Sequence, residues 1–297
     1  MKRARIIYNP SSGREVMRRQ LPYLLESLED HGYEASAHAT KKEGCAKDEA
    51  LRAGQKGYDM VVAAGGDGTV FEVVNGLAPL ANRPKLGVIP AGTSNDFARA
   101  LGIPKSLDRA TEVLYTGEAI PIDVGKVGDK YFINIAAAGS LTELTYDTPS
   151  RLKTVMGQLA YYIKGIEKLP TLSTTQVQIN YDGASFEGEI ILFLVANTNS
   201  VGGFEHLAPQ ASYQDGLFDL LIAKKMSIPE MVRLGHMLLH GEHLHHPKVL
   251  FAQTKSVKVD VETLMHINLD GEYGGMLPGK FENLHRHLSI ITPKGSS

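Results

Sequence analysis

The sequence predicts a two-part α/β protein: a mostly parallel sheet covered by helices, followed by a β-rich, antiparallel part. Up to about residue 118, apolar runs of strand length alternate with stretches whose apolar residues recur at helical spacing. From about residue 119, several strand-like runs follow one another with few helices between them. The length of 297 residues favours two domains, although one large α/β barrel would also fit it.

Each element of the first part has its own local signal. Residues 5–8 are expected to form a buried strand, and residues 9–13 have turn chemistry. Apolar residues at helical spacing predict a helix from about residue 15 to about residue 31, with Gly32 at its C-terminal cap. The further expected elements are a strand at 33–38, a helix at 45–56, a strand at 59–64, a helix through 70–77 and a strand at 86–89.

The second part is predicted to be mainly antiparallel. Residues 177–181 alternate between apolar and polar side chains and meet Asp182-Gly183, which is a strong hairpin signal. Two helices are expected, at about 151–169 and about 229–240. The other expected strands lie at 186–197, 217–223, 256–261 and 266–269.

The composition excludes several classes of protein. With 31 basic and 33 acidic residues the formal net charge is −2, which argues against a general nucleic-acid binder. The single cysteine, Cys45, excludes an intrachain disulfide and a CxxC zinc or redox site. No apolar run has the length of a signal peptide core or a membrane span. We therefore expect a reduced, soluble protein of the cytoplasm.

Three polar, glycine-bearing loops each follow a predicted strand of the first part: 9–13, 65–69 and 92–96. Loops at the carboxyl ends of parallel strands meet in one crevice, and helix N-termini bind anions, so the loops predict a nucleotide phosphate site. Gly65 and Gly66 are expected to provide positive φ and a close approach to the ligand. For a lone loop, an ordinary strand–helix turn would be the better explanation. Neither a Walker A loop nor a GxGxxG fingerprint is present.

Motifs of restricted residue types run through almost the whole chain: YNPSSG at 8–13, GGDGT at 65–69, PAGTSNDFA at 90–98, IDVG at 122–125, AYYIKG at 160–165, GFE at 203–205, QDG at 214–216 and NLDGEYGG at 268–275. With these motifs the sequence resembles the soluble bacterial diacylglycerol kinases, in the lipid-kinase superfamily that also holds sphingosine and ceramide kinases. GGDGT alone is shared with NAD kinases and phosphofructokinases, so the specificity comes from its combination with the later motifs. One departure is Phe71, which stands where the family usually has Asn and puts one contact in doubt.

The resemblance implies an α/β nucleotide-binding domain at residues 1–122, a lipid-side β-sandwich domain at 123–288 and a tail at 289–297 that returns to the first domain. It also makes a homodimer plausible. The ATP-binding residues that it implies are Asn9, Pro10, Ser11, Ser12, Gly13, Thr40, Gly66, Asp67, Gly68, Thr69, Val70, Phe71, Glu72 and Thr93.

Two neighbouring acids are candidates for the general base. Asp270 and Glu272 flank Gly271 directly after a predicted strand, so both carboxylates can point the same way. One of them could accept the proton of a substrate hydroxyl, and the family places the base here. The short side chain favours Asp270, with Glu272 as the alternative. Taken alone, the segment could equally be a turn with solvated acids.

Two magnesium sites are expected. Asp67, Asp96 and Asp123 are interpreted as strand-end acids that suit a hydrated Mg²⁺ near phosphate oxygens, although each alone could be a helix cap or turn residue. The resemblance implies this Mg²⁺–water–Asp network. It also implies a structural Mg²⁺ held by Ser212, Asp215 and Leu217, for which a plain Asp-Gly turn is the alternative.

Basic residues suggest contact with anionic lipid. Arg14 and Lys164 stand out, the first after the first glycine loop and the second on the expected helix 151–169. Solvated faces would explain most of the basic residues. A shared basic face would instead draw a lipid-modifying enzyme to the inner face of the membrane as a peripheral protein.

We therefore predict an ATP- and Mg²⁺-dependent kinase that converts diacylglycerol to phosphatidic acid. The alternatives are a kinase for another lipid or for NAD, or a lipid- or nucleotide-binding regulator without activity. Phe71 is the only hint of the last alternative.

Overall fold

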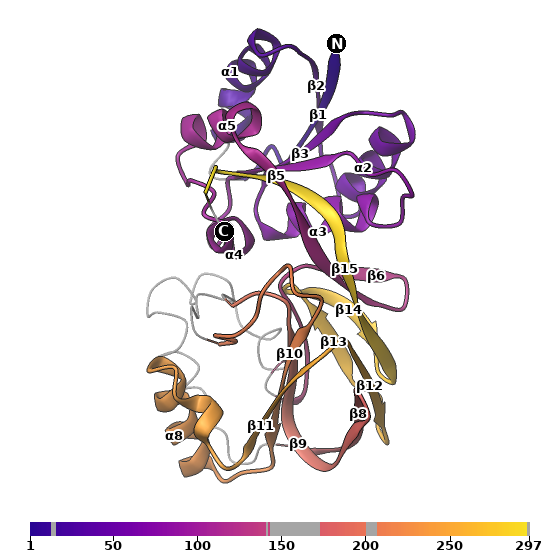
Figure 1. Ribbon diagram of the computed structural model, residues 1–297, viewed down its shortest axis with the longest axis vertical. Coiled ribbons are helices and arrows are strands. Elements are labelled where there is room, and N and C mark those ends of the chain that lie inside the picture. Colours follow the sequence, from indigo (N-terminus) through magenta and orange to yellow (C-terminus); the bar gives the residue numbers. More distant parts are fainter. Residues whose placement is uncertain (13–15, 141, 143–172, 200–206, 296–297) are drawn as a thin grey trace. The chain divides into compact units, whose positions relative to one another are not determined.

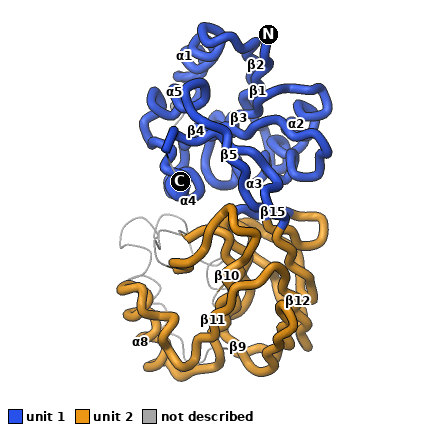
Figure 2. The backbone as a smooth tube through the Cα atoms, in the orientation of Figure 1, with its two compact units in different colours: residues 1–124, 131–133, 284–297 blue, residues 125–130, 134–283 orange. Residues whose placement is uncertain are grey.

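The computed structural model describes residues 1–12, 16–140, 142, 173–199 and 207–295. The chain forms two compact units (Figure 2). Unit 1 contains residues 1–124, 131–133 and 284–297, and unit 2 contains residues 125–130 and 134–283. The expected ranges 1–122, 123–288 and 289–297 differ from this mainly at the C-terminal side. The return to unit 1 begins at Leu284, inside a continuous strand, so that no turn residue marks it in the sequence.

Unit 1 is built on a parallel sheet with the strand order β2-β1-β3-β4-β15. Every residue of β3 is buried, as expected for a central parallel strand covered on both faces. The strands are β1 (Lys2–Tyr8), β2 (Tyr33–Ala39), β3 (Met60–Gly65), β4 (Lys85–Pro90) and β15 (Gly279–Thr292); β5 (Glu118–Val127) pairs with β15 and with β6 (Lys130–Phe132).

Helices cover both faces of this sheet (Figure 1). Strand β2 lies on one side of β1 in the sheet, and β3 and β4 lie on the other side. Because crossovers between parallel strands are right-handed, α1 packs on one face of the sheet and α2 and α3 pack on the other. The apolar stripe predicted for α1 is correct, since Met17, Leu24 and Leu28 are fully buried. The helices are α1 (Val16–Asp30), α2 (Cys45–Gln55), α3 (Asp67–Leu77), α4 (Asp96–Ala100) and α5 (Leu107–Thr116).

Unit 2 is an antiparallel β-sandwich. One layer has the order β14-β13-β7-β9-β10-β11, and the other runs from the first half of β9 through β8 and β12 to β15. Phe193 of β9 meets Phe281 of β15 edge to face at 5.8 Å in the core between the layers. The strands are β7 (Ile135–Ala138), β8 (Thr175–Tyr181), β9 (Ala184–Ala196), β10 (Phe218–Lys224), β11 (Val249–Thr254), β12 (Ser256–Val261), β13 (His266–Leu269) and β14 (Glu272–Met276).

The local signals of unit 2 are also confirmed. Asp182 and Gly183 both have positive φ, 35° and 83°, as the predicted hairpin between β8 and β9 requires. Helix α8 (Ile228–Leu239) begins with a capping box between Ser227 and Glu230 and is followed by the short helix η1 (His243–His245). The expected helix at 151–169 lies outside the described residues. Within the described ranges, no helix is both long and apolar enough to cross a bilayer.

Candidate active site

The strand order of unit 1 brings the three glycine-bearing loops to one edge of the sheet. β1 lies between β2 and β3, and the chain leaves it in opposite directions, which makes the carboxyl ends of β1 and β3 a topological switch point. The Asn9 N–H donates to the Ala64 carbonyl at 3.1 Å, and the Ala91 N–H donates to the Gly65 carbonyl at 2.9 Å. The loops after β1, β3 and β4 therefore start side by side, as the sequence predicts.

The glycines of these loops are required by close packing. Gly66 has φ −88°, and neither Gly65 nor Gly66 is among the described glycines with positive φ, so that expectation was wrong. A Cβ on Gly92 would lie 2.5 Å from the Gly66 Cα, whereas a Cβ on Gly66 would lie 3.3 Å from the Gly92 Cα. A Cβ on Gly65 would lie 2.3 Å from the Thr69 hydroxyl oxygen. The two loops therefore approach too closely for a side chain at Gly92, whereas a Cβ at Gly66 would be a tight contact.

Asn95 holds the second of these loops in place. It adopts the left-handed conformation (φ 49°, ψ 48°), which Asn tolerates better than most residues. Its side chain accepts the Gly92 N–H at 2.9 Å and donates to the Gly92 carbonyl at 2.8 Å. Its own N–H donates to the Asp67 carboxylate at 2.9 Å. Sequence reasoning missed Asn95 as a site residue, although an Asn directly before a helix is a recognisable loop signal.

Two carboxylates lie at the helix starts that face this edge. Asp67 is the first residue of α3, and burial together with the nearby Asp96 raises its pKa above the ordinary value. Asp96 is the first residue of α4 and forms an ion pair with Arg99. Adjacent acids beside a helix N-terminus suit a magnesium ion that also takes phosphate oxygens and water.

The loop after β1 is shaped by an Asn turn. The Asn9 side-chain oxygen accepts the Ser11 N–H at 3.0 Å and the Ser11 hydroxyl at 2.8 Å, and the Asn9 carbonyl accepts the Ser12 N–H at 3.1 Å. The Thr40 N–H donates to the Tyr8 carbonyl at 2.9 Å, which places Thr40 beside this loop. Three of the predicted site residues lie outside the described part of the chain: Gly13, Arg14 and Lys164.

Several implied ATP-binding residues have structural contacts of their own. Both Glu72 carboxylate oxygens accept backbone N–H groups at the start of α2, from Gly44 at 2.9 Å and from Ala46 at 2.8 Å. Val70 is buried, and the Phe71 carbonyl accepts the Asn75 side-chain N–H at 2.9 Å. Glu72 thus links α3 to the start of α2, whereas the Phe71 carbonyl forms its hydrogen bond within α3.

Asp123 differs from its expected position. It lies inside β5 rather than at a strand end, and its side chain is fully buried. Its Oδ1 lies 2.9 Å from His285 Nδ1 and accepts the Arg286 N–H at 2.7 Å. Among the residues that the structure describes, no three His, Cys, Asp or Glu side chains gather closely enough to hold a metal ion. Asp67, Asp96 and Asp123 therefore do not form a direct three-carboxylate metal cluster.

The two candidate base residues lie on a turn of unit 2. Asp270 has a positive φ of 51°, and its Oδ1 accepts the N–H groups of Asn134 and Ile135, both at 2.8 Å. The Gly271 N–H donates to the Asn268 side chain at 2.9 Å. Glu272 begins β14 and is exposed. The turn thus holds Asp270 rigidly, whereas Glu272 lies at the surface.

The expected structural metal site is a second turn of unit 2. The Asp215 Oδ1 accepts the Leu217 N–H at 2.9 Å, and the Ser212 hydroxyl accepts the Gln214 N–H at 3.3 Å. The Leu217 carbonyl accepts the Asn283 side-chain N–H at 3.1 Å. Carboxylate and carbonyl oxygens are the donors that magnesium prefers, so these residues fit that ion.

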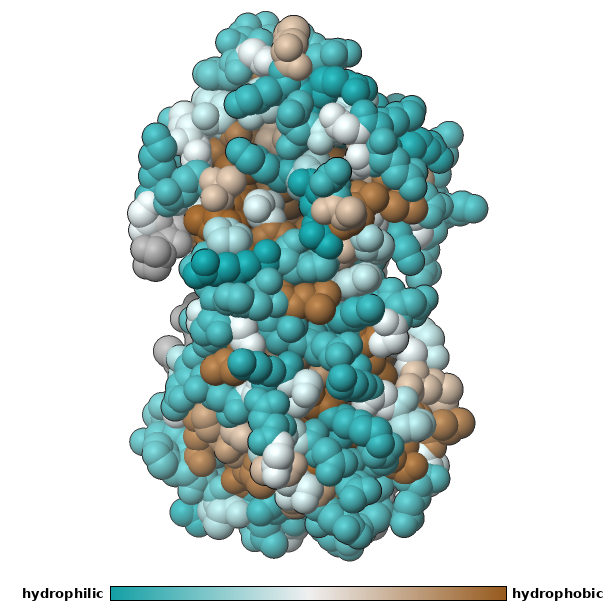
Figure 3. Space-filling model, turned by 45° about the vertical axis from the view of Figure 1, so that its right-hand side comes forward, coloured by the Kyte–Doolittle hydropathy of each residue, from teal (hydrophilic) through white to brown (hydrophobic). Residues whose placement is uncertain are grey.

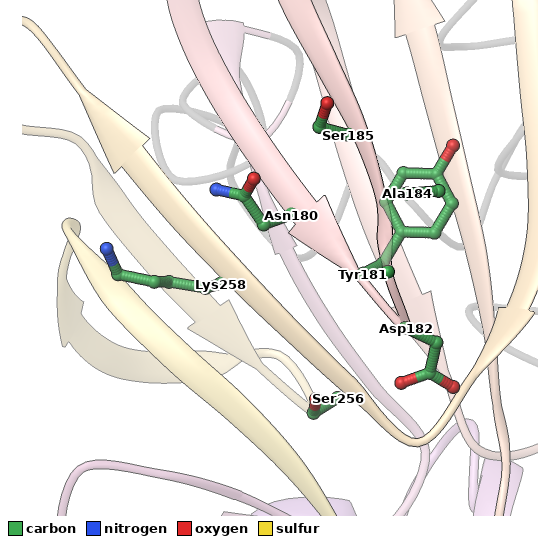
Figure 4. Close-up of a pocket in the computed structure, with 8 residues that line it drawn as sticks. Asn180, Tyr181, Asp182, Ala184, Ser185, Ser256 and Lys258 are labelled. Atoms are coloured by element: carbon green, nitrogen blue, oxygen red, sulfur yellow. The ribbon is translucent and has the colours of Figure 1, made fainter.

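A shallow pocket of 380 Å³ lies elsewhere in unit 2, at the β8–β9 hairpin and β12 (Figure 4). Its lining includes Asn180, Asp182 and Lys258. Lys258 pairs with Asp260 at 2.8 Å, and the Asp182 carboxylate accepts the Lys255 N–H at 2.8 Å. None of the predicted site residues lines this pocket, so it belongs to neither candidate site.

Comparison with known proteins now decides the family. Residues 3–127 match the family described as "Diacylglycerol kinase catalytic domain", and residues 143–292 match "YegS C-terminal NAD kinase beta sandwich-like domain". The diacylglycerol kinase of Bacillus subtilis (strain 168) is 57% identical over 99% of this chain and 97% of its own length. The chain belongs to the diacylglycerol kinase family.

Further members of the diacylglycerol kinase family are similar in sequence or in structure over nearly the whole chain. A diacylglycerol kinase of Staphylococcus epidermidis (strain ATCC 12228 / FDA PCI 1200) is 52% identical over 99% of this chain and 93% of its own length. The crystal structure of a diacylglycerol kinase from Bacillus anthracis str. Sterne has a TM-score of 0.83 at 28% identity, covering 100% of this chain and 98% of its own. The family and the fold expected from the motifs are thereby confirmed.

Proposed function

We propose that this member of the diacylglycerol kinase family transfers the γ-phosphoryl group of ATP to the hydroxyl of diacylglycerol, giving phosphatidic acid and ADP. The observation that supports this most directly is the contact between Gly66 and Gly92, which places two glycine loops and the start of α3 together at the switch point. Relatives at 50–57% identity over nearly the full length carry the name diacylglycerol kinase.

The nucleotide would bind at the loops of unit 1. Backbone N–H groups at the start of α3 and in the loop after β1 would hold the phosphates, helped by the hydroxyls of Thr40 and Thr93. Asp67 and Asp96 would hold a Mg²⁺, which neutralises phosphate charge when bound. Asp123, which accepts hydrogen bonds from within unit 1, would act by fixing β5 and β15.

The acceptor would be activated by an acid of unit 2. The hydroxyl oxygen of diacylglycerol attacks the γ-phosphorus, the bond to the bridging oxygen of ADP breaks, and a carboxylate takes the hydroxyl proton. We assign this role to Asp270, because its position is held by the N–H groups of Asn134 and Ile135. Glu272 remains the alternative.

The surface next to these acids supports a lipid acceptor. Tyr273 and Met276 of β14 and Leu264 before β13 are about half exposed or more, and the Tyr273 ring meets His266 at 5.5 Å. On the face shown in Figure 3, apolar side chains lie in groups among hydrophilic ones. Because diacylglycerol resides in the bilayer, we propose that the protein makes peripheral contact with anionic membrane on its cytoplasmic side.

We also propose that Ser212, Asp215 and Leu217 hold a structural Mg²⁺.

One assay tests this function against its rivals. ADP release from Mg-ATP should require diacylglycerol micelles, and labelled phosphate should appear in phosphatidic acid. The second family description names NAD kinase, so NAD is included as an acceptor, and a sphingoid base is the lipid rival. Transfer to NAD or to the sphingoid base instead of diacylglycerol would contradict the proposed acceptor. No transfer to any of them would favour a regulator.

Matched amide variants then identify the base. Asp270→Asn and Glu272→Gln keep the shape of each side chain and remove the proton acceptor, and the amide oxygen of the Asp270→Asn variant can still accept the two N–H groups. The true base should lose roughly 10²–10⁴-fold in kcat with little change in the KM for ATP. The other acid should lose less. Near-normal kcat in both variants would exclude both acids.

A further inference from the structure

Asp219 is a buried carboxylate for which the reaction above has no use. It is the second residue of β10 and is 1% exposed. Its Oδ1 accepts the Gln253 side-chain N–H at 3.0 Å, whereas its Oδ2 is buried and receives no hydrogen bond from any described residue. A buried carboxylate oxygen without a partner is expensive, and native proteins rarely retain one without a reason.

The position of Asp219 places it next to the predicted structural metal turn. Asp219 pairs with Ala196 of β9 and so shares a face with Leu221, on which Ala208 and Ala211 also pack. The segment that carries Ser212 and Asp215 continues directly from these alanines and returns to β10 at Phe218. The orphaned oxygen therefore lies under this segment.

A nearby negative charge adds to the cost of burying the Asp219 carboxylate. Asp215 lies close enough to Asp219 for the two negative charges to repel each other. No described cation pairs with either acid. A bound divalent cation would neutralise both charges and give the orphaned oxygen a partner.

We propose that Asp219 supplies the second carboxylate of the divalent cation site at Asp215, as a direct ligand or through a cation-bound water. This rests on the structural Mg²⁺ site proposed above and is independent of catalysis. Oxygen donors from two carboxylates and from loop carbonyls match the preference of Mg²⁺. Because Asp219 belongs to the strand and Asp215 to the turn, the cation would fasten the 207–217 segment onto β10.

Thermal unfolding with and without MgCl₂, in the absence of nucleotide and lipid, tests this proposal. The wild-type Tm should rise with Mg²⁺. Asp219→Asn, which keeps the shape and removes the buried charge, should be at least as stable without Mg²⁺ and should lose half or more of the Mg²⁺-dependent rise. Asp215→Asn should lose it as well. Asp260→Asn, which removes the exposed partner of Lys258, should keep the full rise.

One control separates this site from the nucleotide site. The series is repeated in Asp67→Asn, and the rise that survives there is assigned to unit 2. If Asp219→Asn does not fold, Asp215→Asn with calorimetric titration of MgCl₂ decides the cation site, and Asp219→Ser replaces the Asn variant. A Tm that does not respond to Mg²⁺, or a full response in the folded Asp219 variant, would overturn the proposal. Neither result depends on kinase activity.

Discussion

At Asn95 a single side chain connects two loops and a helix. Its side-chain amide forms hydrogen bonds with the N–H and the carbonyl of Gly92, and its backbone N–H donates to the Asp67 carboxylate. We expect Asn95→Ala to destabilise the fold by about 1–3 kcal/mol, because buried partners lose their hydrogen bonds. The KM for ATP should rise about tenfold or more as the loop loosens.

Asn95→Gly is the matched control for this prediction. Glycine adopts the left-handed conformation freely, so this variant isolates the loss of the side-chain hydrogen bonds from backbone strain. It should weaken ATP binding nearly as much as Ala while unfolding less easily. A wild-type KM for ATP in both variants would mean that the loop does not contact the nucleotide. Chemical denaturation and steady-state kinetics provide the two measurements.

The raised pKa of Asp67 should affect how the free energy of unfolding depends on pH. Its folded-state pKa is raised above the ordinary 3.8, so in the window between the two values the folded state binds more protons than the unfolded state. Stability contributed by this group is therefore present at low pH and lost as the pH rises through that window. Asp67→Asn removes the loss, so the variant should gain stability relative to wild type from about pH 4 towards neutrality.

Denaturant unfolding of the two proteins across that pH range measures this difference. The same variant should lose most of its kinase activity, because the proposed magnesium ligand is gone. A constant difference in stability between the proteins at all pH values would show that Asp67 titrates normally in the fold. Such an outcome would also weaken its assignment to a buried, charged site.

At the scale of elements, the approach of the α3 loop to the β4 loop leads to a ranking. A Cβ on Gly92 would lie 2.5 Å from the Gly66 Cα, a backbone atom that cannot easily move, whereas a Cβ on Gly66 has 3.3 Å. Gly92→Ala should therefore impair ATP binding more than Gly66→Ala, and Gly66→Val should abolish it. Gly32→Ala, at a distant helix end, serves as a control for stability alone. Equal affinities in Gly92→Ala and wild type, measured by titration calorimetry, would contradict this packing argument.

Elements with a strong local signal were predictable from the sequence. Residues 256–261 and 266–269 were placed correctly, and the buried run of β3 was shifted by one residue. In contrast, β15 was missed because its residues change surroundings along its length: Phe281 is buried in the sandwich, whereas Ile290 pairs with Leu86 of the parallel sheet. No single period of apolar residues describes such a strand.

The motifs of the candidate site could be predicted from the sequence, but the contacts that hold its residues in place could not. Glycine loops and acids could be found because their residue types are restricted by chemistry. The hydrogen bonds from His285 and Arg286 to Asp123 join residues that are far apart in the sequence, so no local sequence pattern predicts them. The same holds for Asp219, whose neighbours include Ala196 of β9 and Gln253 of β11.

At the scale of the whole molecule, unit 1 is assembled from three separate stretches of chain. A fragment of residues 1–133 would lack β15, which pairs with β4 and supplies the partners of Asp123. We expect this fragment to unfold at a lower temperature, without a cooperative transition, and to bind ATP weakly. Residues 279–297 joined to it by a Gly/Ser linker should restore both properties. A stable, ATP-binding fragment without this addition would show that β15 is dispensable.

The late position of β15 in the chain also has a consequence for protein synthesis. The nucleotide loops leave the ribosome early, but the strand that completes their sheet is about 200 residues further on, which at about 5–20 residues per second takes on the order of 10–40 s. During this interval the edge of β4 has no neighbour and is open to chaperones or to wrong pairing. A prematurely terminated chain would therefore carry every phosphate-binding motif and still lack the completed sheet, so nucleotide binding would report that translation had reached its last strand.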